Sequence, residues 1–134
     1  MTALIEWNFD SAAAVRAEIA RAEFMAIIKT VSHEQGDLES CELIFGELIG
    51  NVVRHAPGPV KIRLDWLAEY PTLRVHDERQ PFKPTFGLPE DPLQESGRGL
   101  FIVRSLARSV RVEDLVGDGT IVEAVLPVRR CVGS

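Results

Sequence analysis

The sequence predicts an α+β domain in which helices cover one face of an antiparallel or mixed sheet. Two observations carry this prediction. Segments with apolar residues at helical spacing are followed by segments in which apolar residues recur at every second position. The latter come as pairs joined by turns, which favours antiparallel pairing with helices packed on one side. The chain has 134 residues, which suits one core, so we take residues 1–134 as a single domain.

The N-terminal third is expected to contain a short strand at residues 3–8 and a helix. Asp10 or Ser11 can cap that helix. Apolar residues at helical spacing predict its course: Val15, Ile19, Ala22 and Ala26.

A second helix is predicted after the polar break SHEQGD. Asp37 can cap it, and PGP at residues 57–59 stops it, because proline cannot continue a helix. From residue 60 the apolar period changes to two, through 60–66, and TLRVHD at 72–77 forms the second strand of a hairpin with one solvated face.

The C-terminal third is expected to begin with a helix at residues 97–109, entered through glycines. Residues 111–115 then form a strand, GDG a turn, and residues 120–128 the last strand. Residues 78–96 contain four prolines and no sustained periodicity. A loop this long in a compact domain is usually functional or disordered.

Composition excludes several classes of protein. The chain is 46% apolar and 26% charged, as in an ordinary globular domain, and its net charge of −5 argues against a general nucleic-acid binder. No stretch approaches the roughly 18 apolar residues that span a bilayer, and the N-terminus does not resemble a secretory signal. Two cysteines give no disulfide framework. We therefore expect a cytoplasmic protein.

One stripe of the second helix is unexpectedly polar. At about 100° per residue, Glu47, Asn51 and His55 share a narrow stripe. It lies beside or within the apolar arc of the same helix, which is expected to be buried and carries Leu43, Ile44, Leu48 and Val52. Each of the three polar residues alone fits a partly exposed helix edge. Together they indicate a site in which a carboxylate acts as a base while an amide oxygen binds a hard cation such as Mg²⁺.

Three further segments could carry chemistry. Asp77 ends a predicted strand, where a carboxylate can accept hydrogen bonds from a ligand, although aspartate is also a common turn residue. In SGRGLFIV, glycines before a helix allow backbone amides to face an anion. In GDGT, a hairpin turn accounts for the glycines, and Thr120 is an ordinary strand residue.

Taken in order, ELIGN, a strand ending in aspartate, a long loop, GRGL and GDGT resemble the ATP-binding boxes of the GHKL superfamily. Within it, the chain is similar to the anti-sigma factor serine kinases, over about residues 10–127. The resemblance implies the Bergerat (histidine-kinase-like ATPase) fold, a two-layer α/β sandwich, with ATP held under a lid loop, here residues 78–96.

The resemblance also implies roles for single residues. Asn51 would coordinate Mg²⁺, and Glu47 would be the catalytic base that takes a proton from a substrate serine. Asp77 would bind the adenine amino group, with support from Thr120. The nucleotide-binding GRGL residues would lie at or beside the triphosphate: Gly97, Arg98, Gly99 and Leu100.

Two other residues depart from, or add to, this pattern. His55 would have a structural role at the helix end. Arg79 replaces the glycine that the family usually has two residues after the aspartate, which adds bulk where the backbone approaches the base.

The function implied is that of an ATP- and Mg²⁺-dependent protein-serine kinase that regulates transcription. Its partners would be a sigma factor or other regulator, a STAS-domain anti-anti-sigma factor as substrate, and a second copy of the chain in a homodimer, with no direct contact to nucleic acid or membrane.

Three alternatives stay open. The first is a partner-switching binding module with weak or no nucleotide binding, as Arg79 suggests. The second is the catalytic domain of a histidine kinase, which would follow a dimerisation helix pair, whereas here the first predicted helix begins close to residue 11. The third is a globular α/β protein in which the boxes are coincidental.

Overall fold

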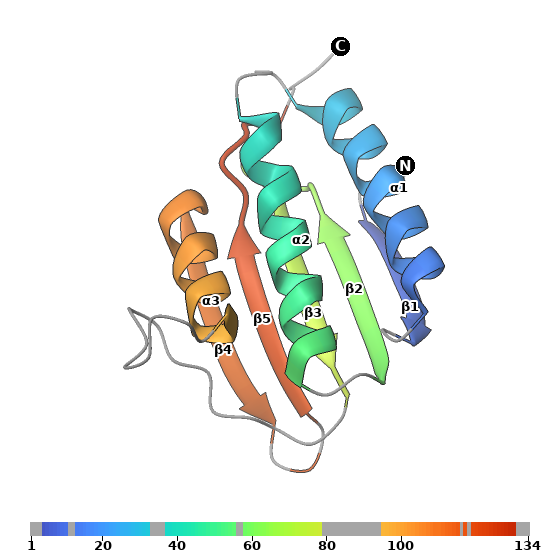
Figure 1. Ribbon diagram of the computed structural model, residues 1–134. Helices are drawn as coiled ribbons and strands as arrows, with labels where there is room; N and C mark the ends of the chain where they lie inside the picture. The colour runs from blue at the N-terminus through green and yellow to red at the C-terminus, as the bar shows by residue number, and fades with distance from the viewer. Residues whose placement is uncertain are drawn as a thin grey trace.

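A computed structural model describes most of the chain: residues 4–10, 13–32, 37–55, 58–78, 95–115, 117 and 119–130. Three helices lie on one face of a five-stranded sheet, so the molecule has two layers (Figure 1). In chain order the elements are β1 (Leu4–Asp10), α1 (Ala14–Val31), α2 (Leu38–His55), β2 (Pro59–Asp65), β3 (Thr72–Asp77), α3 (Glu95–Leu106), β4 (Ser109–Leu115) and β5 (Gly119–Val125). The predicted α+β class is confirmed.

The sheet has the strand order β1-β2-β3-β5-β4, and every pairing is antiparallel. In β2 and β3, buried and partly exposed residues alternate along each strand, as expected for a hairpin with one solvated face. The buried positions, which include Asp77, face the helices, and the other charged positions face away from them. The register places Asp77, at the end of β3, opposite Val60 on one side and Thr120 on the other.

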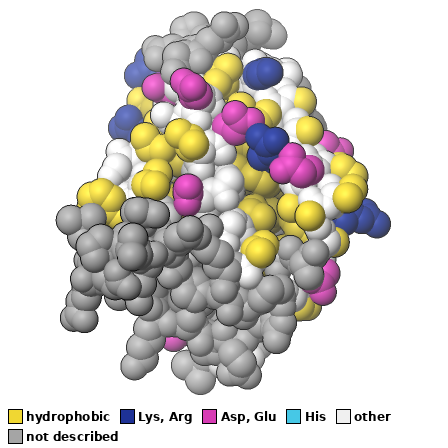
Figure 2. Space-filling model, in the orientation of Figure 1, with side chains coloured by type: hydrophobic (Ala, Val, Ile, Leu, Met, Phe, Trp, Pro, Cys, Tyr) yellow, Lys and Arg dark blue, Asp and Glu magenta, His cyan; other side chains and the backbone are white. Residues whose placement is uncertain are grey.

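Helix α1 forms where predicted, but the apolar stripe that predicted it does not face the core. Val15 and Ile19 are 73% and 50% exposed, and Ala22 and Ala26 are exposed too. The buried residues of α1 lie on another face: Ala20, Phe24 and Ile28. The helix is apolar on both faces, so periodicity alone could not select the one that packs. Figure 2 shows hydrophobic side chains among charged ones over this helical layer.

Helix α2 lies across the centre of the sheet, between α1 and α3 (Figure 1). Ile44, Leu48 and Val52 are buried as predicted, whereas Leu43 is 51% exposed. Phe45 stacks on Phe24 of α1 with ring centroids 4.8 Å apart. Arg21 of α1 also donates to Glu42 of α2 at 2.7 Å, so both apolar and charged contacts join the two helices.

The ends of several elements differ from their predicted positions. Strand β1 continues to Asp10, so this residue cannot cap α1, and Ser11 lies outside the described residues. Ala13 precedes α1 and makes no side-chain capping bond; its backbone N–H donates to the Asp10 carbonyl at 2.9 Å. Asp37 directly precedes α2, and its carbonyl accepts from the Cys41 N–H at 3.1 Å.

The start of α3 is a further correction. The helix begins at Glu95, so Gly97 and Gly99 lie inside its first two turns and not in front of it. The predicted lid at 78–96 therefore loses its last two residues to α3, and residues 79–94 lie outside the description. Glycine lowers helix stability but is tolerated near an end, where backbone N–H groups have no helical partners.

Candidate functional site

Three buried polar residues, one on α2 and two on the sheet, line the same hollow at the end of the core where β3 ends and β5 begins. Asn51, Asp77 and Thr120 are each 2% exposed and are the buried polar residues among those described. With four apolar residues they line a hollow: Leu48, Val52, Val75 and Val122. The space within it is about 10 Å³, room for roughly one water molecule, so the hollow by itself does not enclose a nucleotide.

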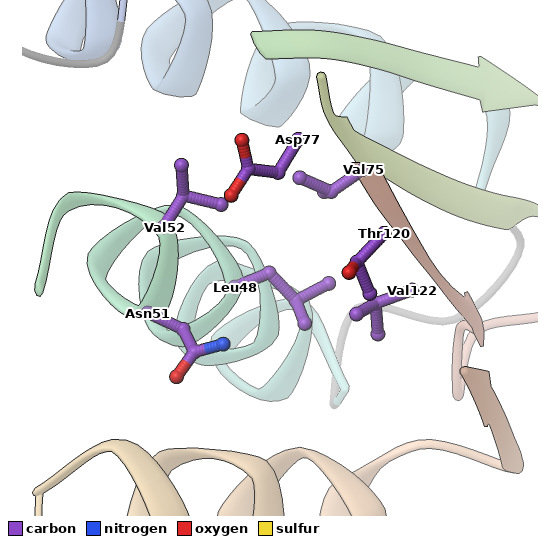
Figure 3. Close-up of a pocket in the computed structure, with 7 residues that line it drawn as sticks. All are labelled: Leu48, Asn51, Val52, Val75, Asp77, Thr120 and Val122. Atoms are coloured by element: carbon purple, nitrogen blue, oxygen red, sulfur yellow. The ribbon is translucent and has the colours of Figure 1, made fainter. Parts of the chain in front are cut away.

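Asp77 and Thr120 are brought together by the sheet. They are directly paired on β3 and β5, and in Figure 3 both side chains lie on the side of the strands that faces α2. In the sequence they are separated by a long segment that includes α3 and β4, but antiparallel pairing makes them neighbours. The predicted association of Asp77 with Thr120 thus has a geometric basis in the register.

Gly119 has a second role besides the turn: it lies close to the backbone of Asp77. It has a φ of +94°, which favours glycine, and a Cβ here would lie 1.8 Å from the Asp77 carbonyl oxygen. Gly117, with a φ of +84°, has nothing within 4 Å of such an atom. Gly117 therefore serves the turn, whereas Gly119 also allows the close approach of β5 to Asp77.

Asn51 enters the hollow from the helix. Its carboxamide is directed toward α3, whereas the Asp77 carboxylate lies near Val52 on the sheet side (Figure 3). The Asn51 Oδ1 is buried and accepts no hydrogen bond from any described group, and the same holds for the Thr120 Oγ1. A buried acceptor without a partner costs about 1–3 kcal/mol, which a bound cation or ligand donor would offset.

Glu47 lies one helical turn before Asn51 and is half-buried. It is not among the described residues that line the hollow, so it stands at the margin of the site. His55 is the last residue of α2, and its side chain lies outside what the structure describes. Of the three residues in the predicted polar stripe, the structure therefore describes the side chains of Glu47 and Asn51.

Helix α3 contains the GRGL residues and lies on the side of α2 toward which the Asn51 carboxamide is directed. Gly99 and Leu100 are buried, and Leu100 belongs to the hydrophobic core with 2% exposure. Gly97 is described as part of the helix, and the side chain of Arg98 lies outside the description. A contact of these residues with a triphosphate stays a prediction, as does any effect of Arg79, which also lies outside the described residues.

Other potentially reactive groups are not part of the site. Burial raises the pKa of the Cys41 thiol to about 12, with a smaller contribution from Asp37, so the thiol stays protonated in the core. Among the described side chains, no group of three His, Cys, Asp or Glu residues could hold a metal ion. A cation at Asn51 could take further oxygen ligands from a bound nucleotide, as Mg²⁺ often does.

The residues present fit a nucleotide with its Mg²⁺. A buried carboxylate on the sheet suits an amino donor, the Thr120 hydroxyl beside it can donate or accept, and the unsatisfied Asn51 Oδ1 suits a hard cation. The apolar side chains around them would exclude water from a planar base. Gly119 and the four apolar lining residues are not among the site residues predicted from the sequence; the signal for Gly119 was a second glycine directly before Thr120.

Comparison with known proteins agrees with this geometry. The family model described as the histidine kinase-like ATPase domain matches residues 10–126. No curated protein sequence matches the chain. No helix in the described ranges is long and apolar enough to cross a membrane.

The matched segment contains every predicted site residue, and the α+β fold with its antiparallel sheet is the one that this family implies. The chain therefore belongs to the histidine kinase-like ATPase domain family.

Proposed function

We propose that the protein is an ATP-dependent protein-serine kinase of the anti-sigma factor type, acting on a STAS-domain antagonist in the cytoplasm. Membership of an ATPase domain family supports ATP binding. The observation that carries the kinase proposal is the position of Glu47 on α2, one turn before the buried Asn51, because a base must stand beside the metal-bound phosphates without being enclosed.

Each residue would have one task. Asp77 would accept a hydrogen bond from the adenine amino group, and Thr120 would support that contact from the neighbouring strand. Asn51 would hold Mg²⁺ through Oδ1, while Gly97, Arg98, Gly99 and Leu100 would border the triphosphate at the start of α3. When bound, ATP would supply the phosphoryl group, and Mg²⁺ would neutralise part of its charge.

Glu47 would then accept the proton of a substrate serine as the serine oxygen takes the γ-phosphoryl group and ADP leaves. Phosphoryl transfer depends mainly on positioning and charge neutralisation, so a small set of groups is sufficient. A half-buried carboxylate suits this role, because it is reachable by a substrate side chain while being held by the helix.

Transfer of label from γ-labelled ATP to STAS-domain proteins of the source cell tests the proposal. We expect one of them to be labelled on serine, and the label to be lost in Glu47→Gln with ATP binding retained. Glu39→Gln is the matched control, because Glu39 is an exposed carboxylate in the first turn of the same helix. Wild-type protein that binds ATP but labels none of these proteins would overturn the kinase assignment.

A second candidate is a partner-switching module in which regulation occurs by protein contact alone. The sequence DERQPF favours it, because Arg79 stands where the family usually has glycine. Titration of the wild-type chain with a fluorescent ATP analogue in Mg²⁺ separates the two functions. Micromolar binding supports the kinase, and no binding at millimolar nucleotide supports the module.

The partners that we propose are a sigma factor or other regulator and its STAS-type antagonist, with a second copy of the chain in a homodimer. Their capture would depend on nucleotide. A pull-down with and without ATP, followed by phosphosite mapping of the retained proteins, identifies them.

A further inference from the structure

The face of the sheet that carries no helix has a cluster of basic side chains at its centre. This face is turned away from the viewer in Figure 1. Lys61 and Arg63 on β2 stand opposite His76 and Arg74 on β3, respectively. All four alternate with buried residues that face the helices, so their side chains project from the open face.

These residues border a hollow. Lys61, Arg63, Arg74 and His76, with Ile121 of β5, line a space of about 160 Å³. We name these five residues the basic hollow. A second space of about 180 Å³ adjoins it, because Arg63 and Arg74 line both. The surface is therefore concave where the positive charges gather, although the whole chain has a net charge of −5.

The charges along one row of the sheet alternate except at this point. Across the strands the row has the order Glu6, Arg63, Arg74, Glu123 and Arg111. Ion pairs at its flanks join Arg63 to Glu6 at 3.1 Å and Arg111 to Glu123 at 3.2 Å. Only the central pair, Arg63 and Arg74, brings two like charges directly opposite each other, an arrangement that destabilises a sheet.

The carboxylates nearby satisfy the Arg74 guanidinium only in part. Glu123 forms an ion pair with Arg111 and a longer one with Arg74, whose Nε lies 3.8 Å from the carboxylate, too far for a hydrogen bond. That Nε is buried and has no hydrogen-bond acceptor in the described part of the chain. The hydrogen bond from Arg63 is the largest cause that lowers the pKa of Glu6, and the charges of Lys61 and Arg63 lower this pKa further.

We propose that the basic hollow binds a phosphate group, supplied as free inorganic phosphate or by a phosphorylated side chain. Guanidinium groups bind phosphate through paired N–H donors, and a phosphate carries close to two negative charges at neutral pH, which suits a cluster of basic side chains better than the single charge of a carboxylate does. The site is separate from the nucleotide site, because Asp77 and His76, adjacent on β3, face opposite sides of the sheet.

An amide-resolved NMR titration of the full chain tests the proposal. Inorganic phosphate, O-phosphoserine and acetate are added separately at constant ionic strength. We expect saturable shifts with the two phosphates at amides of β2, β3 and β5 around the basic hollow, and none that saturate with acetate. Tighter binding of O-phosphoserine than of phosphate identifies a phosphorylated side chain as the source, and the reverse identifies the free ion.

Variants make the assignment specific. Lys61→Gln should weaken phosphate binding about tenfold, the factor for loss of one charge-assisted hydrogen bond. It also relieves repulsion, so we expect it to fold. Lys29→Gln, an exposed lysine at the end of α1, is the control and should have no effect. Equal affinity in both variants, shifts that do not saturate, or shifts centred on Asn51 and Thr120 would overturn the proposal.

Discussion

The two halves of α2 cover the same sheet but have very different neighbours. In the first half, Phe45 is 1% exposed and stacks on Phe24 of α1, so that apolar side chains fill the space between the layers. In the second half, Leu48 and Val52 are equally buried, yet they share a hollow with Asn51. Burial is the same in both halves, and what differs is whether the buried groups satisfy one another.

We infer from this difference that the first half of α2 serves mainly the stability of the fold and the second half mainly the binding of a ligand. Packed aromatic rings stabilise the fold by themselves. The Oδ1 of Asn51 and the Oγ1 of Thr120 are buried without a hydrogen bond among the described groups, which costs free energy in the absence of a ligand. Substitutions in the first half should therefore change the free energy of unfolding, and those in the second half should mainly change affinity for nucleotide.

The largest effect is expected from Phe45→Ala. It leaves a cavity beside Phe24 and should lower the free energy of unfolding by about 3–5 kcal/mol, measured by urea denaturation. Leu43→Ala on the same helix is the control, because Leu43 is 51% exposed and should cost much less. Similar losses in the two variants would contradict the contrast in packing.

Gly119→Ala should affect both stability and binding, because Gly119 lies where the sheet meets the site. The φ of +94° alone costs alanine roughly 1–2 kcal/mol. The contact with the Asp77 carbonyl should add to this loss and displace Asp77, which weakens nucleotide binding. Gly117→Ala shares the positive φ but has open space, so it isolates the backbone contribution. If both variants lose the same stability and affinity, the close approach of Gly119 to Asp77 contributes neither to folding nor to nucleotide binding.

Asp77→Asn should act on binding far more than on folding. Loss of a hydrogen bond to a charged acceptor corresponds to roughly 1.5–3 kcal/mol, so affinity for the fluorescent ATP analogue should fall about ten- to a hundredfold. The neighbouring Glu78→Gln changes an exposed carboxylate and should leave affinity intact. Unchanged affinity in Asp77→Asn would remove this residue from the nucleotide site.

Thr120→Val sharpens the same distinction with a smaller change. The two side chains are nearly equal in shape, and the buried hydroxyl has no hydrogen-bond partner in the described structure. We expect the free energy of unfolding to stay the same or to rise by up to about 1 kcal/mol, while nucleotide affinity falls severalfold. A clear loss of stability in the nucleotide-free protein would show that the hydroxyl already serves the fold.

The smallest effect is expected from Ile19→Gln on the exposed stripe of α1. Because Ile19 is 50% exposed, the free energy of unfolding should change by no more than about 0.5 kcal/mol. Met25→Gln, on a half-buried position of the same helix, should cost more. A large loss in Ile19→Gln that depends on protein concentration would indicate that a second copy covers this stripe.

Much of the fold could be predicted because its signals are local. The two-residue period predicted the β2–β3 hairpin, and PGP predicted the end of α2 near His55. The predictions failed where two solutions satisfy the same local rule. The stripe beginning at Val15 has helical spacing, but so does the buried stripe with Phe24, and only packing on the sheet decides between them.

The sequence by itself determined the residue types and the order of the site: a carboxylate and an amide one turn apart on a helix, an aspartate at a strand end, and a glycine before Thr120. The tertiary structure decided that Asp77 and Thr120 are paired, that Gly119 contacts the backbone of Asp77, and that Lys61, Arg63, Arg74 and His76 gather on the open face. Local periodicity fixes which face of a strand a side chain occupies, but strand order and register fix its neighbours, because they join residues that are far apart in the chain.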